Sequence, residues 1–189
     1  MPLTLPDATV ELVADAAIFS ADRIDPGTKY LLMEAPSPPP AATNALDLGC
    51  GYGPIAVTLA RRSPEATVWA VDVNERAVAL CQANAERLGH TNVRTSMVAA
   101  DQPFGTVPED VRFDVIWSNP PIRIGKEAMH ELLLQWLARL TPAGHAYLVV
   151  QKHLGADSLL RWLTERGFVV DRFGARSGYR ILHITPGAP

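Results

Sequence analysis

The stretch ALDLGCGYGPIAVTLARRS, residues 45–63, decides the fold. A short apolar run ends at Leu48, and glycines then stand at three alternate positions before Pro54 (Gly49, Gly51 and Gly53). Glycine tolerates positive φ angles and lets a ligand approach the backbone, while proline suits the first turn of a helix. The stretch therefore predicts a strand, a tight turn and a helix whose free N–H groups can bind an anionic ligand.

The spacing of these glycines argues against a dinucleotide ligand. A dinucleotide-binding turn has the pattern G-x-G-x-x-G/A, and counted from Gly49 its third small residue would stand at position 54. Pro54 occupies that position, and its ring would obstruct close packing of the helix on the strand. The sequence therefore disfavours NAD as the ligand.

Length and composition indicate one domain with a substantial core, because the chain has 189 residues of which 48% are hydrophobic. No apolar run reaches the roughly 18 residues of a membrane span, and no signal peptide is evident, so we expect a cytoplasmic protein without membrane contact. We expect Cys50 and Cys81 to be buried thiols rather than a disulfide or a metal site. The five histidines show no metal-binding spacing either, so no metal is predicted.

Charge is unevenly distributed along the chain. Residues 1–110 carry 7 basic and 14 acidic side chains, a balance of −7, whereas residues 111–189 carry 10 and 6, a balance of +4. The second half is therefore the better candidate for contact with phosphate groups. The alternative is that this excess forms an ordinary solvated face.

Strands and helices alternate along most of the chain. Residues 1–35 are expected to form a lead-in over the cofactor site, with a short strand within 8–13 and a turn at 25–28 that opens a helix. The proline-rich residues 36–44 form a stiff connector. Residues 45–189 form the main domain, with a turn at 141–144 before a strand at 145–150. This alternation predicts an α/β fold with a doubly wound, mostly parallel sheet.

An acidic residue ends the second strand of this domain. Asp72 follows Gly49 by 23 positions, where a carboxylate can accept hydrogen bonds from both ribose hydroxyls of an adenosine ligand. The alternative is an aspartate that only caps the following helix.

The run Ser118-Asn119-Pro120-Pro121 follows another predicted strand directly. Two prolines force the chain to leave the sheet in an extended, rigid form, which holds Asn119 at the carboxyl edge of the sheet. The Asn119 side-chain oxygen and the Pro120 carbonyl can then both accept from one NH₂ group. Two such hydrogen bonds orient a conjugated amine and direct its lone pair toward an electrophile.

The pattern D-x-G-x-G-x-G at residues 47–53 resembles the first motif of the class I S-adenosylmethionine (SAM) methyltransferases. That resemblance implies a Rossmann-like, seven-stranded sheet of order 3-2-1-4-5-7-6 with a reversed seventh strand, and SAM as the cofactor. It places Asp47 near the amino group of SAM and Asp101 near its adenine, although a simple loop aspartate is an alternative for Asp101. The implied cofactor-binding residues are Thr28, Asp47, Gly49, Cys50, Gly51, Gly53, Asp72, Val73 and Asp101.

The motif (N/D/S)-P-P-(Y/F/W) marks methyltransferases that act on planar amines. Together with IFSADRIDPGTKYLL upstream and SGYRILHITP near the end, the run FDVIWSNPPIRIGKE resembles the small-domain family that includes bacterial small-subunit ribosomal RNA guanine-N2 methyltransferases. The likeness covers about residues 15–186. It implies catalytic roles for Asn119, Pro120 and Pro121, a substrate contact for Ile122, and ribosomal RNA or the small subunit as partner. Arg123 and Lys126, in the basic half near the strand ends, are candidate substrate-binding residues that would contact phosphate. Phe19-Ser20 and Gly27-Thr28 would belong to a segment that closes over SAM.

Two departures from the family qualify this prediction. Ile122 stands where the family usually has an aromatic residue that stacks on the target, and Tyr52, Trp117 or Tyr179 would have to replace it, unless each only packs in the core. The best-known relatives also have a second, amino-terminal domain of similar fold. The predicted function is methyl transfer to guanine N2 in ribosomal RNA, and the alternatives are methylation of a protein glutamine or a small amine, or a non-catalytic RNA-binding module.

Overall fold

The structure is a computed structural model that describes residues 1–14, 24–121 and 124–187. A small hairpin of β1 (Pro2–Leu5) and β2 (Ala8–Glu11) and the helix α1 (Pro26–Glu34) come first. The following elements are β3 (Asn44–Leu48), α2 (Pro54–Arg62), β4 (Thr67–Asp72), α3 (Glu75–Arg87), β5 (Val93–Met97), β6 (Phe113–Ser118) and α4 (Lys126–Leu137). The chain ends with β7 (Leu140–Gln151), the 3₁₀ turn η2 (Lys152–Leu154), α5 (Ala156–Glu165), β8 (Val169–Arg176) and β9 (Tyr179–Thr185).

The main sheet has seven strands in the order β5-β4-β3-β6-β7-β9-β8. Its first five strands are parallel, and β9 runs antiparallel to both β7 and β8. Counted from β3, this is the order 3-2-1-4-5-7-6 with a reversed seventh strand, so the predicted fold class is confirmed. The order reverses at β3 and β6, and in such sheets ligands bind beyond the carboxyl ends of the strands at this point.

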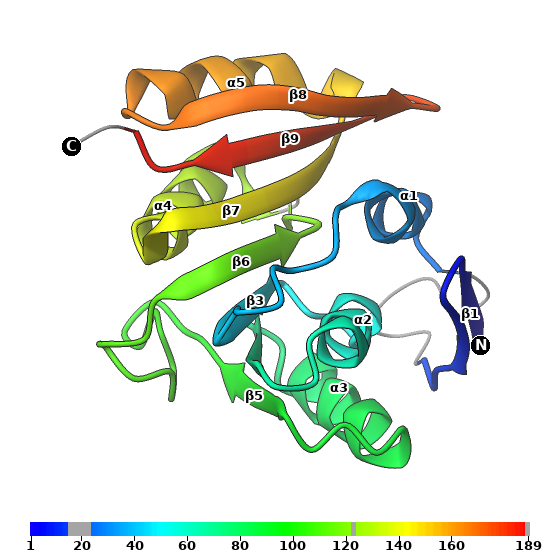
Figure 1. Ribbon diagram of the computed structural model, residues 1–189. Coiled ribbons are helices and arrows are strands. Elements are labelled where there is room, and N and C mark those ends of the chain that lie inside the picture. Colours follow the sequence, from blue (N-terminus) through cyan, green and yellow to red (C-terminus); the bar gives the residue numbers. More distant parts are fainter. Residues whose placement is uncertain (15–23, 122–123, 188–189) are drawn as a thin grey trace.

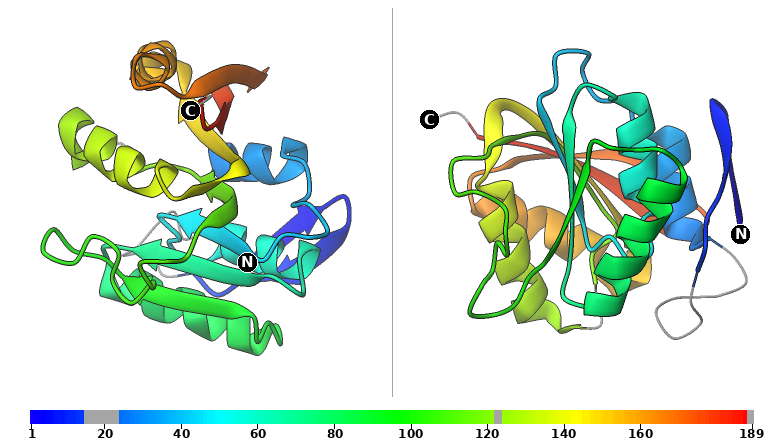
Figure 2. Two further views of the ribbon diagram at one scale, coloured as in Figure 1. Left: turned by 60° about the vertical axis from the view of Figure 1, so that its left-hand side comes forward. Right: turned by 90° about the horizontal axis from the view of Figure 1, so that it is seen from below.

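Helices cover both faces of the sheet (Figures 1 and 2). One core contains α1, α2 and α3 with strand residues such as Ala45 and Val115, and the other contains α4 and α5 with their neighbours Leu46 and Ile116. Successive strand residues therefore enter opposite cores, which explains why β3 and β6 each have apolar residues at consecutive positions (Ala45-Leu46 and Val115-Ile116-Trp117). No helix of the described residues is long and apolar enough to cross a membrane.

The amino-terminal hairpin is held against α2 and α3 by polar contacts. The Arg62 guanidinium donates to both carboxylate oxygens of Asp7, at 2.9 and 3.0 Å, and to the Leu32 carbonyl at 3.1 Å. The buried Asn84 amide exchanges two hydrogen bonds of 2.8 Å with the Val13 backbone. The predicted strand within 8–13 is confirmed as β2. Its antiparallel partner β1 was not predicted, because the short PLTL segment has too few residues to show a strand pattern.

The predicted turn at residues 141–144 lies inside β7. Leu140 pairs with Phe113 and His145 with Val115, so residues 141–144 bulge opposite the single residue Asp114. A Cβ on Gly144 would stand 2.7 Å from the Phe113 carbonyl, which makes glycine necessary there. The turn residues therefore form a bulge that interrupts the register of β6 and β7 without ending the strand.

Candidate active site

The glycine turn between β3 and α2 has the backbone conformation that its sequence predicts. Gly49, Gly51 and Gly53 have φ angles of 82°, 53° and 96°. The N–H groups of Gly49 and Cys50 both donate to the Val71 carbonyl at 2.9 Å, which fixes the turn against the end of β4. A Cβ on Gly51 would meet no atom within 4 Å, so this part of the turn faces open space where a ligand can lie.

Gly53 and the two cysteines form the contact between α2 and α3. Gly53 is the N-cap of α2, and a Cβ there would stand only 2.8 Å from Cys81 Sγ. Cys50 and Cys81 are free, buried thiols, as predicted. A hydrogen bond with Cys81 and burial raise the pKa of Cys50 well above its usual value.

Asp47 lies beneath the turn. Its carboxylate is fully buried, and Oδ2 accepts a hydrogen bond of 2.9 Å from the Ala56 N–H near the start of α2. Oδ1 is buried without a hydrogen-bond partner, and burial raises the pKa of the carboxyl well above its usual value. Contact between Asp47 and the amino group of SAM stays a prediction, in which Oδ1 supplies the open acceptor.

The residues predicted for the adenosine half lie at the ends of β4 and β5. Asp72 is half-buried, and its oxygens accept from the N–H groups of Gly51 at 2.9 Å and Asn74 at 3.0 Å. Val73 is 57% exposed, and Asp101 is exposed on the loop after β5. A carboxylate has about four acceptor sites, so Asp72 can hold the turn and still accept from ribose hydroxyls. These roles stay predictions.

The Asn-Pro-Pro run lies directly beside the glycine turn. Ser118, at the end of β6, donates from its hydroxyl to the Leu48 carbonyl at 2.6 Å. A Cβ on Gly49 would stand 3.7 Å from Pro121 Cδ and 3.8 Å from the Asn119 carbonyl oxygen. The two motifs, far apart in sequence, therefore meet at the point where the strand order reverses.

The amide of Asn119 reaches across to the start of α1. Its Nδ2 donates to Asp25 Oδ1 at 2.8 Å and to Thr28 Oγ1 at 3.0 Å. Asp25 is also the N-cap of α1 and accepts from the Thr28 N–H at 2.8 Å. The sequence shows Asp25 only as part of a turn that opens a helix, so its contact with Asn119 is a feature that sequence reasoning missed.

A small cavity lies between these elements. It measures about 40 Å³ and is lined by residues of the turn, of α1 and of the Asn-Pro-Pro run: Asp25, Thr28, Gly49, Cys50, Gly51, Tyr52, Pro54, Ile55 and Asn119. Pockets that enclose a whole small molecule are roughly 300 Å³ or larger. The cavity therefore has room for one end of a ligand, whose remainder would lie on the open surface toward Asp72.

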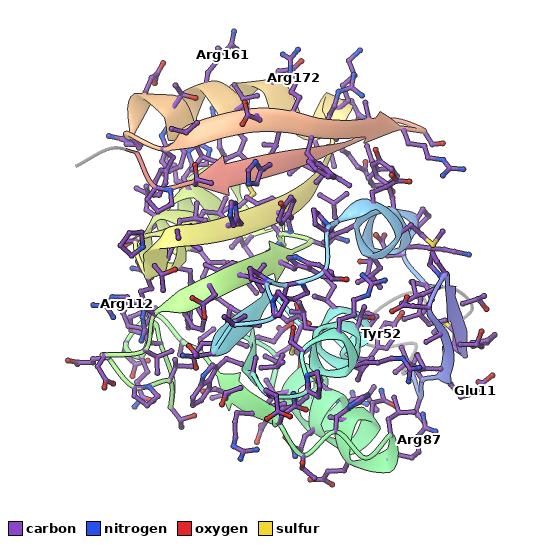
Figure 3. The ribbon with its side chains drawn as sticks, viewed as in Figure 1. Glu11, Tyr52, Arg87, Arg112, Arg161 and Arg172 are labelled. Carbon is purple, nitrogen blue, oxygen red and sulfur yellow. The ribbon has the colours of Figure 1, made fainter. Side chains whose placement is uncertain are left out.

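The aromatic residues weighed as substitutes for Ile122 differ in position. Trp117 is fully buried, with the Arg62 guanidinium 5.8 Å from its ring centre. Tyr52 is 3% exposed and lies on the side of the sheet that α1 covers (Figure 3). Tyr179 is half-buried and packs against Gly27, where a Cβ would stand 2.6 Å from its ring. Tyr179 is therefore the most accessible of the three.

The remaining predicted site residues are either outside the described residues, exposed, or buried in the cavity wall. Ile122, Arg123, Phe19 and Ser20 lie outside the described residues. Lys126 is exposed at the first position of α4. Thr28 is buried and lines the cavity, which brings it next to Asn119 as well as to the glycine turn.

A parallel sheet of this order, a glycine turn at its switch point and an acidic residue ending the next strand define a class I methyltransferase fold. The model of the methyltransferase small domain family matches residues 9–183, and the chain belongs to that family. Its members use SAM, and the cavity, the open space beside Gly51 and the unpartnered Asp47 Oδ1 fit such a cofactor.

Two relatives illustrate this membership. The Bacillus subtilis protein YbxB, whose function is uncharacterised, is 36% identical over 169 residues, which are 89% of this chain and 82% of that protein. Ribosomal RNA small subunit methyltransferase C of Shewanella halifaxensis is 31% identical over 156 residues, which are 80% of this chain and 43% of that protein.

A solved structure shows the same architecture. The T. thermophilus 16S rRNA N2 methyltransferase RsmC, in complex with AdoMet and guanosine, aligns with a TM-score of 0.70 and 26% identity. The alignment covers 89% of this chain and 45% of that one. The chain thus spans less than half the length of these two ribosomal RNA methyltransferases.

Proposed function

We propose that this protein transfers the methyl group of SAM to a planar exocyclic amine, and that the amine is guanine N2 in ribosomal RNA. The division into a lead-in at 1–35, a connector at 36–44 and a methyltransferase domain at 45–189 is part of this proposal. The RNA substrate is supported by the likeness to small subunit methyltransferase C and to the N2 methyltransferase from T. thermophilus.

The observation that carries the proposal is the position of Asn119 beside the glycine turn. Both line the same cavity, and the Gly49 Cβ position is 3.8 Å from the Asn119 carbonyl oxygen. A target amine that donates hydrogen bonds to Asn119 would therefore lie next to the methionine end of a cofactor held by the turn. Bringing two reactants together in this way removes much of the entropic barrier to their reaction.

The residues of this site would act mainly by orientation. SAM, when bound, supplies an electrophilic methyl group on a sulfonium. The Asn119 side-chain oxygen and the Pro120 carbonyl accept from the two N–H bonds of the amine, which keeps its lone pair directed at that methyl group. The same two oxygens stabilise the positive charge that develops on the nitrogen. The excess proton leaves to water after transfer.

Replacing Asn119 by alanine tests this role. Asn119→Ala should slow turnover about 10²- to 10³-fold, by analogy with the loss of one preorganised hydrogen-bonding group at a charge-developing atom. SAM affinity should be nearly unchanged, because Pro120 and Pro121 still fix the backbone. The measurement is transfer of labelled methyl to small ribosomal subunits that lack native methylation, with nuclease digestion to identify the base.

A matched control is Asn44→Ala, which removes an asparagine at the opposite, amino edge of the sheet. It should keep the wild-type rate. Wild-type turnover by Asn119→Ala, or label on carbon or oxygen, would contradict the amine-orienting role. Transfer to a glutamine side chain or a small amine instead of RNA would identify the alternative substrates. RNA binding without SAM affinity in calorimetry would indicate a non-catalytic RNA-binding module.

A further inference from the structure

The amide of Asn119 has two possible orientations, and its neighbours decide between them. An amide offers two N–H donors on one side and an oxygen acceptor on the other, and exchanging the two reverses what the side chain can bind. Asp25 Oδ1 lies 2.8 Å from Nδ2, and an ionised carboxylate only accepts hydrogen bonds. The nitrogen must therefore face Asp25.

Thr28 alone would not impose this orientation. Its hydroxyl lies 3.0 Å from Nδ2, but a hydroxyl can donate as well as accept and would tolerate the reversed amide. With Asp25 present, both amide hydrogens are directed to α1. The oxygen is thereby the group that Asn119 presents to an incoming amine.

Asp25 is itself rigidly held. The same oxygen that accepts from Asn119 accepts from the Thr28 N–H at 2.8 Å, and the Asp25 carbonyl accepts from the Lys29 N–H at 2.9 Å. Pro26 occupies the first position of α1 and fixes the entry of the chain into the helix. The start of α1 thus fixes the position of the Asp25 carboxylate, and this carboxylate in turn fixes the orientation of the Asn119 amide.

The charge of Asp25 also acts on the cavity that both residues line. Burial, and secondly the Asp25 carboxylate, raise the pKa of Tyr52 to about 12. Tyr52, Asp25 and Asn119 all line this cavity. The carboxylate is therefore at the site and not merely at a helix end nearby.

We infer that Asp25 is a positioning residue for methyl transfer, which holds the Asn119 amide in the orientation that exposes its oxygen to the target amine. This inference rests on the proposed function, because it concerns the same acceptor. It assigns a second role to an N-cap residue that lies 94 positions from Asn119 in sequence.

Two substitutions separate the positioning role from helix capping. Asparagine, aspartate and serine are all good N-caps. Asp25→Asn keeps an oxygen that can accept from both Thr28 N–H and Asn119 Nδ2, whereas in Asp25→Ser the hydroxyl is one bond shorter and caps α1 without reaching Asn119. A capping role predicts equal activity of the two variants, and a positioning role predicts that Asp25→Asn is far more active.

We expect Asp25→Ser to lower kcat for methyl transfer about tenfold or more, with SAM affinity by calorimetry within about twofold of wild type. Asp25→Asn should recover most of the lost rate. Equal rates in the two variants would overturn the inference. Asp114→Ser serves as a control, because it removes a carboxylate that accepts from Thr43 and Asn44 at the opposite edge of the sheet and should leave kcat unchanged.

A spectroscopic measurement tests the geometry without turnover. In ¹H–¹⁵N spectra of the full chain, the Asn119 side-chain amide can be assigned by its loss in Asn119→Ala. One of its proton signals should move upfield in Asp25→Ser and stay near its wild-type position in Asp25→Asn. An unmoved signal in Asp25→Ser would contradict the inference even if the wild type methylates RNA. A wild-type protein that transfers no methyl to an amine, with the signal shifted as expected, would contradict only the proposed function.

Discussion

At the scale of single residues, the buried carboxyl of Asp47 is a source of instability in the ligand-free site, because one of its oxygens has lost water without gaining a hydrogen bond. It has one hydrogen bond, to the Ala56 N–H, and its second oxygen is buried without a partner. Burial raises the pKa of this carboxyl. At a pH between the pKa of the unfolded chain and that of the folded protein, the carboxyl is therefore protonated in the folded protein and ionised in the unfolded chain. The ligand-free fold therefore loses stability as the pH rises from the unfolded pKa, about 4, toward the raised pKa of the folded state.

Replacing this carboxyl by an amide should remove that pH dependence. Asp47→Asn keeps an oxygen for the Ala56 N–H but does not titrate. The stability of Asp47→Asn relative to wild type should therefore increase as the pH rises above about 4. Urea unfolding of both proteins without SAM over a pH series measures this difference. A difference that is constant with pH would show that the Asp47 pKa is not raised.

Asp72 should matter for cofactor affinity. Asp72→Ala removes the predicted acceptor of the ribose hydroxyls and also the hydrogen bond that holds the Gly51 N–H. We expect the free energy of SAM binding to weaken by about 2 kcal/mol, as for loss of a charged hydrogen-bonding group. Isothermal titration calorimetry measures it, and unchanged affinity would remove the ribose assignment. A thermal unfolding curve of each protein checks that the variant is folded.

At the scale of the elements, the α2–α3 contact depends on the absence of a side chain at Gly53. Gly53→Ala would force alanine into a φ of 96° and place its Cβ 2.8 Å from Cys81 Sγ and 3.3 Å from Cys81 Cα. We expect a loss of about 2 to 3 kcal/mol in the free energy of unfolding, measured in urea without ligand.

Gly89→Ala is the matched comparison for this loss. Gly89 has a φ of 77° and no atom within 4 Å of its Cβ position, so its substitution carries the backbone penalty without the collision. It should cost about 1 kcal/mol. An equal loss in the two variants would mean that α3 moves away from α2 without cost.

Most of the elements could be predicted from the sequence because their signals are local. Apolar runs bounded by turn residues marked β3 and β4, and the Asn74 cap marked the start of α3. β1 was not predicted, because a strand of four residues is too short to show an alternation of apolar and polar side chains. The bulge at residues 141–144 looked like a turn because turn and bulge use the same proline and glycine residues, and only the partner strand distinguishes them.

At the scale of the whole molecule, the positive charge of the second half is spread over several elements. Arg161 on α5 and Arg172 on β8 lie at one edge of the sheet (Figure 3), whereas Lys126 begins α4. Arg172 is partly neutralised by Asp157 at 3.1 Å. Lys126, which follows the Asn-Pro-Pro run by a few residues, is therefore the better candidate for a phosphate contact near the site.

RNA binding, if it uses this charge, should weaken steeply with salt. Lys126→Ala should reduce the slope of log affinity against log salt concentration by about one, the value for one lost phosphate contact. Filter binding of ribosomal RNA over a salt series measures the slope. Arg94→Ala, on β5 in the acidic half, should leave it unchanged. A salt-independent wild-type affinity would favour a protein or small-molecule substrate.

The parts of the site that the sequence could not reveal are those that join distant segments. The glycine turn and the Asn-Pro-Pro run each carry a local pattern, so their residues could be proposed one by one. The hydrogen bond between Asp25 and Asn119 has no local signal, because it exists only when α1 lies across the carboxyl end of β6.

The hydrogen bond from Asn119 to Asp25 also has a consequence for the order of folding. It closes a loop of 94 residues that includes β3, α2, β4, α3 and β5, and β6 must pair with β3 before Asn119 reaches its place. Closing so long a loop costs conformational entropy, and the contacts that offset this cost form only when the intervening strands have joined the sheet. We therefore expect this hydrogen bond to form late in folding. A nascent chain still short of β6 contains the residues of the glycine turn but not Asn119. We therefore expect the predicted cofactor-binding turn to be able to form before the predicted amine-binding group is in place.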